Sequence, residues 1–270
     1  MTDPTSASAR GYLLDNQGSE AGQRFDSLAA LFNPVTFRHV EALGVASGWH
    51  CWEVGAGGPS VPRMLSSKVG PSGRVFATDI DESWVHEAAG HNVEVRRHDV
   101  AADDPPGVFD FVHARLVLVH VPQREAALQN LVAALRPGGW LLIEDFDPAM
   151  QPLACVDVVG PEQRLANKIR AGFRALLAQR GVDLEFGRRL PRLLREAGLV
   201  DVAADAFMPM ALAAGAQLET ANVNQVRAGL IAGGHATADE IDAHLRAVGA
   251  GELDVTTPPL ISAWGRRPPG

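Results

Sequence analysis

The chain has 270 residues, a formal net charge of −8 at pH 7, 46% hydrophobic residues and 21% charged residues. This length can bury a full core in one α/β domain with additions, and the composition is typical of a soluble globular protein. The acidic balance argues against a nucleic-acid partner, and no apolar run reaches the roughly 18 residues of a membrane span. We expect a cytoplasmic protein, because no secretory signal is visible and two cysteines, Cys51 and Cys155, are too few for a disulfide framework.

The first predicted elements are helices within residues 19–43. Apolar side chains recur there at helical spacing, so that Phe25, Leu28, Leu31 and Phe32 share one face. We expect these helices to cap a ligand-binding cleft.

A short apolar strand, Cys51–Val54, then leads into a glycine-rich turn and the start of a helix. Gly55 and Gly57 let the backbone turn sharply and approach a ligand, and the helix offers unpaired N–H groups at its N-terminus. A dinucleotide-binding G-x-G-x-x-G pattern is the rival interpretation, but Ser60 stands at its third glycine. Glu53 would be unfavourable beside a pyrophosphate, whereas it suits a cofactor with a cationic amino-acid end, such as S-adenosylmethionine (SAM).

Further strands are predicted in chain order at 73–79, 93–100, 109–114 and 140–145. The first of these ends in Asp79, and an acid there suits the paired ribose hydroxyls of either NAD or SAM. The next ends near Asp99, and the last is preceded by a helix that closes at Gly138 and Gly139. Alternating strands and helices of this kind indicate a parallel sheet.

Five segments in order carry a family resemblance: E-V-G-A-G-G at 53–58, A-T-D-I-D at 77–81, R-H-D-V at 97–100, F-D-F-V-H-A-R at 109–115 and L-R-P-G-G-W-L-L-I-E-D at 135–145. Together they resemble the class I SAM-dependent methyltransferases over roughly residues 45–150, and a terminal strand near 260–265 extends the match. The chain departs from the pattern at Pro59, where many members have a third glycine. Pro59 lacks an N–H, so the loop offers one donor fewer.

The resemblance implies a SAM site along the carboxyl ends of the first four strands. The residues expected to line it are Glu53, Gly55, Ala56, Gly57, Asp79, Ile80, Asp99, Val100, Ala114, Arg115 and Tyr12. Glu53 would meet the ammonium of the methionine moiety, and Asp79 the ribose. Ile80 would pack on the adenine, and Asp99 would bind its amino group. Structural roles are the alternatives: turn formation for the acids, and packing or ion pairing for the others.

A methyl acceptor with a hydroxyl group must lose a proton, and two histidines, His113 and His120, are the candidate catalytic bases near the predicted cleft. His120 lies in an apolar segment, so core packing is its alternative role. Glu144 and Asp145, at the end of the fifth strand, are alternative bases. No metal site is predicted, because the acids and histidines lack ligand spacing.

The predicted fold class is α/β: a Rossmann-like, doubly wound sheet of seven strands, mostly parallel, with an antiparallel C-terminal edge strand and helical cap elements. Late helices are predicted at 161–179 and 191–196, and residues 216–248 are predicted to form two helices separated by Gly233-Gly234. A late strand is predicted from 199 and the final strand at 260–265. The predicted division is 1–45 as N-terminal tail and helical lid, 46–150 as SAM-binding core, 151–235 as helical insertion and late strand of the substrate pocket, and 236–270 as C-terminal helix and edge strand.

We therefore predict a SAM-dependent methyltransferase that acts on an oxygen or nitrogen of a small molecule, such as a secondary metabolite. A homodimer is one expected assembly, and neither a nucleic acid nor a membrane is an expected partner. One alternative is a protein or RNA acceptor. The other is a SAM-binding or NAD-binding protein without methyltransferase activity.

Overall fold

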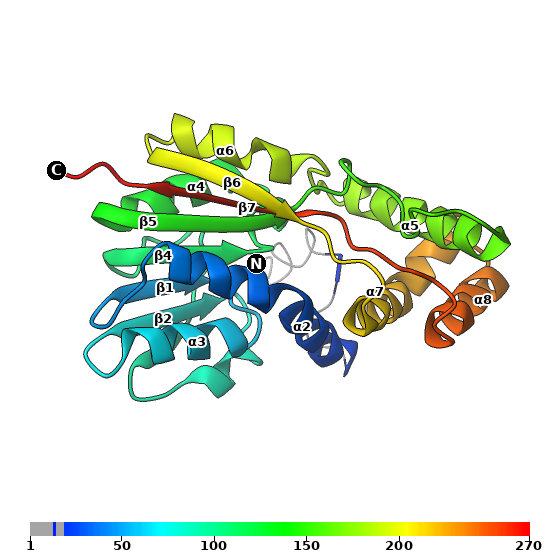
Figure 1. Ribbon diagram of the computed structural model, residues 1–270, viewed down its shortest axis with the longest axis horizontal. Coiled ribbons are helices and arrows are strands. Elements are labelled where there is room, and N and C mark those ends of the chain that lie inside the picture. The colour runs from blue at the N-terminus through cyan, green and yellow to red at the C-terminus, as the bar shows by residue number, and fades with distance from the viewer. Residues whose placement is uncertain (1–12, 15–18) are drawn as a thin grey trace, which may run out of the picture. The chain divides into compact units, whose positions relative to one another are not determined.

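The computed structural model describes residues 13–14 and 19–270, which belong to two compact units (Figure 1). The sheet unit consists of Phe32–Phe146, Phe186–Phe207 and Leu260–Gly270. The described part of the helical unit consists of residues 13–14, 19–31, 147–185 and 208–259. Helix α2 (Ser19–Ala42) contributes residues to both units.

Seven strands form one sheet in the order β3-β2-β1-β4-β5-β7-β6 (Figure 1). Their bounds are β1 (His50–Val54), β2 (Arg74–Asp79), β3 (Val93–Arg97), β4 (Phe109–Arg115), β5 (Leu135–Phe146), β6 (Val200–Phe207) and β7 (Leu260–Arg266). Strands β1 to β5 pair in parallel, whereas β7 runs antiparallel to β5 and β6. The predicted α/β class with a mostly parallel, doubly wound sheet is confirmed.

The C-terminal strand is antiparallel as predicted, but its expected place at the edge needs correction. It lies between β5 and β6, and β6 is the outermost strand. The burial of the two strands gives the reason: five of the seven residues of β7 are buried, whereas all eight residues of β6 are exposed or half-buried. A strand with a neighbour on each side is largely covered and needs buried residues, whereas an edge strand can expose its residues to solvent.

The helices of the sheet unit besides the end of α2 are α3 (Ser60–Val69), α4 (Arg124–Ala133) and α6 (Phe186–Glu196), with short 3-10 turns η1 (Val85–Ala88) and η2 (Leu118–His120). Helix α3 buries Leu65 and Val69 in the same apolar cluster as Cys51 of β1 and Val75 of β2. This packing fixes the helix behind the glycine-rich loop. Residue Pro59, without a side-chain hydrogen bond, is the N-cap.

The helical unit contains α5 (Pro161–Gln179), α7 (Ala213–Ala232) and α8 (Ala238–Gly249). The bounds of α5 match the predicted helix, and the predicted break at Gly233-Gly234 separates α7 from α8. Thr237 caps α8, because its hydroxyl accepts a hydrogen bond from the Glu240 N–H at 3.2 Å. These helices pack through a cluster of buried side chains: Ile169, Leu176, Val223, Val226, Leu230, Ala236 and Ile241.

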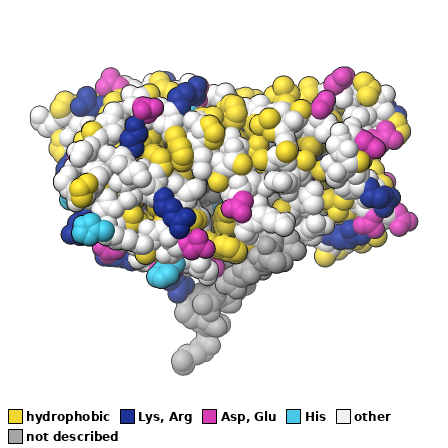
Figure 2. Space-filling model, turned by 60° about the horizontal axis from the view of Figure 1, so that its bottom comes forward, with side chains coloured by type: hydrophobic (Ala, Val, Ile, Leu, Met, Phe, Trp, Pro, Cys, Tyr) yellow, Lys and Arg dark blue, Asp and Glu magenta, His cyan; other side chains and the backbone are white. Residues whose placement is uncertain are grey.

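The face shown in Figure 2 carries charged side chains of both signs. In the view of Figure 2, Lys and Arg side chains lie singly or in small groups among acidic and uncharged ones. Among the described residues, none of the helices combines the length and apolar character that a membrane crossing requires.

Candidate functional site

The glycine-rich loop after β1 has a conformation that requires glycine. Gly55 and Gly57 have φ angles of +58° and +60°, in the left-handed region. A Cβ at Gly55 would lie 2.4 Å from Cγ2 of Val117, so the position also lacks room for a side chain. Leu116, just before that valine, itself has a φ of +58° and donates its N–H to the Glu144 carbonyl at 2.8 Å.

The end of β2 is tied to this loop through Asp79. The carboxylate is 7% exposed and accepts hydrogen bonds from the N–H of Gly57 at 2.9 Å and of Asp81 at 3.0 Å. Burial raises the pKa of Asp79, and these two amides oppose that shift. Ile80, the next residue, is 48% exposed although it is apolar. A fixed carboxylate beside an exposed apolar side chain fits a ribose with an adjoining adenine.

Glu53, near the end of β1, is 2% exposed. Its Oε2 lies 2.6 Å from Nδ1 of His113, and its other carboxylate oxygen accepts no hydrogen bond from any described residue. That oxygen is open to a hydrogen-bond donor from a ligand. The ammonium of a methionine moiety is such a donor, so Glu53 fits the cofactor implied by the fold.

His113 joins Glu53 to a second buried acid. Strand β4 lies between β1 and β5, with His113 level with Glu53. Its Nε2 lies 3.3 Å from Oε2 of Glu144, and the ring is completely buried. Burial lowers the pKa of His113, but the charges and hydrogen bonds of the two acids outweigh burial and raise it to about 9. At neutral pH this histidine is an imidazolium without a vacant lone pair, so its surroundings do not support a general base.

Both carboxylate oxygens of Glu144 have hydrogen-bond partners. It accepts hydrogen bonds from Ser262 Oγ at 2.7 Å and from Thr36 Oγ1, and Nδ1 of His39 lies 3.3 Å away. Burial raises the pKa of Glu144, but the hydrogen bonds from His113 and His39 lower it well below its ordinary value. Such a carboxylate is a poor base, because it is held ionised by the groups around it.

Arg115 turns toward α2. It donates hydrogen bonds to Thr36 Oγ1 at 2.9 Å and to Asn33 Oδ1 at 3.0 Å. Ala114, before it, is fully buried. The sequence reasoning missed Thr36 and His39, yet a signal existed. Both are polar residues three positions apart in a helix whose neighbouring residues Val35 and Val40 are buried.

The predicted adenine site shows mainly local contacts. Asp99 accepts a hydrogen bond from the Ala101 N–H at 2.9 Å, and its own N–H donates to Asp103 Oδ2 at 2.8 Å. The Val100 carbonyl accepts from Asn130 Nδ2 at 3.0 Å. The alternative of a turn-forming acid describes Asp99 well, and an adenine contact stays a prediction.

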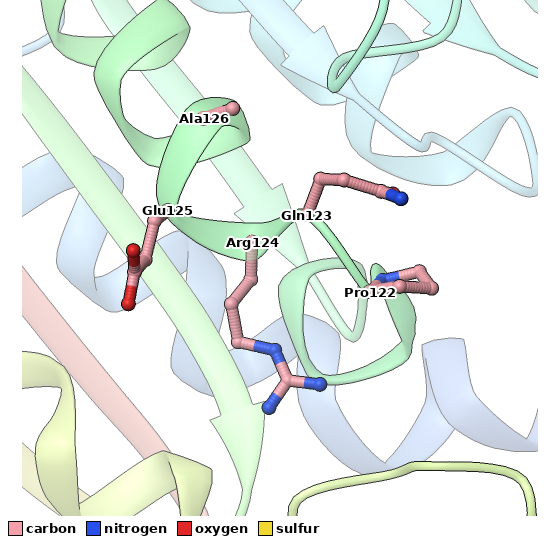
Figure 3. A pocket seen from close by; sticks show the side chains of 5 residues that line it. All are labelled: Pro122, Gln123, Arg124, Glu125 and Ala126. Atoms are coloured by element: carbon pink, nitrogen blue, oxygen red, sulfur yellow. The ribbon is translucent and has the colours of Figure 1, made fainter.

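The region after β4 holds the remaining base candidates. His120 ends η2, is half-buried and precedes a surface pocket lined by residues 122–126 (Figure 3). In Figure 3, the side chains of Gln123 and Glu125 extend to opposite sides of Arg124. Asp145, at the end of β5, is fully buried, and burial raises its pKa well above the ordinary value. Burial therefore disfavours the ionised form of Asp145.

Three further points complete the comparison with the sequence-based site. Tyr12 lies outside the described residues. Within residues 13–14 and 19–270, no group of three His, Cys, Asp or Glu side chains is placed to hold a metal ion. Ala56, whose N–H donates to the Thr78 carbonyl at 3.0 Å, lies in the loop as expected.

The fold and the loop define the class of protein. A parallel sheet, a glycine-rich loop after β1 and acids at the ends of β1 and β2 fit a SAM-dependent methyltransferase of the class I, Rossmann-like type. A family model described as a methyltransferase domain matches residues 50–204. The chain belongs to this family, and SAM is the cofactor of its class.

Two curated relatives show where the similarity lies. The chain is 29% identical over 156 residues to the ubiquinone/menaquinone biosynthesis C-methyltransferase UbiE of Hahella chejuensis, which covers 50% of this chain and 63% of that protein. It is 34% identical over 93 residues to methyltransferase str3 of Strobilurus tenacellus, covering 33% of this chain and 31% of that protein. The chain thus spans less than two thirds of the length of these relatives.

A solved structure resembles the fold over most of the chain. Phosphoethanolamine N-methyltransferase 2 of Haemonchus contortus, in complex with phosphomonomethylethanolamine and S-adenosylhomocysteine, matches with a TM-score of 0.58 and 15% identity. The match covers 97% of this chain and 60% of that one. At this identity the likeness concerns the fold alone.

Proposed function

We propose that this protein transfers a methyl group from SAM to an oxygen or nitrogen of a small molecule. The observation that carries the proposal is the arrangement at the ends of β1 and β2. One carboxylate oxygen of Glu53 accepts no hydrogen bond from any described residue, and Asp79 is fixed by two backbone amides beside the exposed Ile80. These groups suit the two ends of the cofactor, the ammonium and the ribose.

When bound, SAM supplies an electrophilic methyl group on a sulfonium, which is a good leaving group. The chain then has to hold the acceptor in line and exclude water, and positioning of this kind can lower a barrier by up to about 7–11 kcal/mol. His120 is the base that we propose for a hydroxyl acceptor, because His113 and Glu144 are engaged in their own buried hydrogen bonds. An amine acceptor would need no such base.

A small acceptor is favoured over RNA by the net charge of −8 and by the mixed charges on the face in Figure 2. The assignment of residues 1–45 and 151–235 to a lid and an acceptor pocket, the homodimer and the cytoplasmic location stay predictions. The printed name of the relative from Hahella chejuensis describes a C-methyltransferase. Carbon acceptors therefore belong in any substrate screen.

Calorimetry with SAM, S-adenosylhomocysteine and NAD tests the cofactor. We expect saturable binding of the first two and none of NAD, because Glu53 is placed where it would oppose a pyrophosphate. A screen of small hydroxyl, amine and activated-carbon acceptors with methyl-labelled SAM then tests the reaction. Micromolar NAD binding without SAM binding would overturn the proposal.

A further inference from the structure

His113 is a buried cation between two buried acids on neighbouring strands. Its two ring nitrogens contact Glu53 of β1 at 2.6 Å and Glu144 of β5 at 3.3 Å. We infer that His113 is a positioning residue for the cofactor: it donates to both acids and so holds Glu53 with its second oxygen turned free for the cofactor ammonium. This inference rests on the proposed function, because it assumes that SAM binds at this loop.

The geometry demands a proton on each nitrogen. The ring nitrogens lie 2.6 and 3.3 Å from the two carboxylates, which leaves no room for a water molecule between them. A neutral imidazole has one N–H and one lone pair. It would point that lone pair at a carboxylate oxygen, which is repulsive in a buried site. Only the imidazolium satisfies both partners, and charge-assisted hydrogen bonds of this type are the strong ones.

The groups around the two acids explain why Glu53, and not Glu144, has a carboxylate oxygen without a donor among the described residues. Glu144 receives further hydrogen bonds from α2 and from β7, through His39 and Ser262. Arg115, on the same strand as His113, also carries its charge near both acids. On the far side of His39 lies Asp205 of β6, with its Oδ2 3.1 Å from His39 Nε2.

Glu53 has no such second donor among the described residues. Its one hydrogen bond to His113 therefore sets the direction of the whole carboxylate. The site contains a preformed acceptor for a cation, and no reorganisation of Glu53 is needed when the ligand arrives.

Loss of the imidazolium should weaken cofactor binding. Glutamine at this position can donate from only one end of its amide, so one carboxylate loses its donor and the pair loses its shared cation. Arg115 still carries its charge near both acids but donates its hydrogen bonds to Thr36 and Asn33, so Glu53 keeps no hydrogen-bond donor among the described residues. Glu53 would then be free to rotate, which weakens its attraction for an ammonium. A change of one pKa unit corresponds to about tenfold in affinity.

The experiment measures binding of S-adenosylhomocysteine, which keeps the ammonium and cannot donate a methyl group. Calorimetry is carried out on the wild type, His113→Gln and the matched control Ser262→Ala, at pH 7 and at about pH 10. The pKa of His113 is raised to about 9, so at about pH 10 most of the wild-type imidazole is neutral and should no longer strengthen ligand binding. The amine of the ligand titrates equally with every protein, so the readout is the ratio of variant to wild-type Kd.

We expect a ratio of about ten for His113→Gln at pH 7 that falls toward one at about pH 10. Ser262→Ala removes a donor from Glu144 without touching Glu53, and its ratio should stay near one at both pH values. A ratio near one for His113→Gln at pH 7, or a large ratio that does not change with pH, overturns the positioning role. A wild type that binds no S-adenosylhomocysteine at all overturns the proposed function instead.

A second measurement does not depend on the folding of a variant. Nitrogen NMR of the wild-type imidazole side chains reports the proton on each ring nitrogen. We expect His113 to carry both protons at pH 7, to titrate near pH 9 and to shift when S-adenosylhomocysteine is added. A neutral ring at pH 7, or a ring that the ligand leaves unchanged, contradicts the inference.

Discussion

The N–H of Gly57 donates a hydrogen bond to Oδ2 of Asp79 across 2.9 Å, so that the loop after β1 and the end of β2 are one connected site. The same carboxylate also holds the N–H of Asp81. Asp79 therefore has two tasks in our proposal: it contacts the ribose, and it fixes the loop that approaches the methionine end of the cofactor.

We expect Asp79→Ala to weaken SAM binding by roughly tenfold or more, because hydrogen bonds to a charged group contribute about 1.5–3 kcal/mol each. Isothermal calorimetry provides the measurement. Asp99→Ala is the comparison variant and should lose less, since its carboxylate binds the N–H of Ala101 in its own turn. Equal affinity in Asp79→Ala and the wild type would show that the cofactor lies elsewhere.

Gly55→Ala should destabilise the sheet unit, because the new Cβ would lie 2.4 Å from Val117 at a φ of +58°. We expect a loss of about 1–3 kcal/mol in a urea titration, typical of overpacking. Gly251→Ala is a matched control at a φ of +72° with nothing within 4 Å of the added carbon. It should lose only the cost of the backbone conformation, about 1 kcal/mol.

The double variant Gly55→Ala with Val117→Ala tests the cause of that loss. If the clash with Val117 dominates, the two substitutions together should cost less than their sum, with a coupling of about 0.5–3 kcal/mol. Strict additivity would indicate that backbone strain alone is responsible.

His120→Ala separates two kinds of acceptor. If His120 removes a hydroxyl proton, kcat should fall by about 10²–10⁴ while SAM affinity stays nearly constant. An amine acceptor should show a far smaller loss. Steady-state kinetics and calorimetry on the same preparation make the comparison. A variant with lower stability and an unchanged kcat in its folded fraction would identify His120 as a packing residue.

The helical unit contains an acid whose titration should control its acid stability. Glu219 lies 2.6 Å from Arg170 and 3.1 Å from His244, all three buried. Burial raises the pKa of Glu219, but the charge of Arg170 and the contact with His244 lower it to about 2. An acid with a lowered folded-state pKa stabilises the fold above its unfolded value of about 4.3 and loses this contribution as the pH falls toward 2.

Glu219→Gln should accordingly cost about 3–5 kcal/mol at neutral pH, because it leaves the Arg170 guanidinium buried without its counter-charge. The difference from the wild type should shrink between about pH 4 and pH 2. Thermal unfolding followed by circular dichroism across that range is the measurement. Lys168→Ala, which removes the exposed ion pair to Glu240, should change stability by less than about 1 kcal/mol. A pH-independent difference for Glu219→Gln would exclude the titration as its source.

Much of the core could be predicted from the sequence because its signals are local. The glycine turn after an apolar strand and the acid Asp79 can each be recognised from a few consecutive residues. The helix at Pro161–Gln179 could likewise be predicted from the spacing of its apolar residues. By contrast, α6 begins at Phe186 and contains Pro191, which the sequence placed at its start. Buried Phe186 and Leu190 extend the helix despite the hydrogen bond that proline removes.

The environment of His113 depends on partners distant in sequence. Glu53 lies 60 residues before it and Glu144 31 residues after it, so only the strand order reveals that one imidazole joins both. The sequence allowed a catalytic role for His113, since it could not show that both nitrogens are engaged. The sequence also could not show that the last strand lies between β5 and β6, because antiparallel pairing alone does not specify which strand is outermost.

The place of β7 also sets an order of assembly. Strand β6 pairs with β7 alone, yet it precedes β7 in the chain by more than fifty residues. During synthesis from the N-terminus, β6 has no sheet partner until Leu260–Arg266 has emerged from the ribosome. The same late segment brings Ser262 to Glu144. A nascent chain halted before residue 260 therefore leaves β5 with an open edge and β6 without a sheet partner, and two of the seven strands can join the sheet only once the last segment is available.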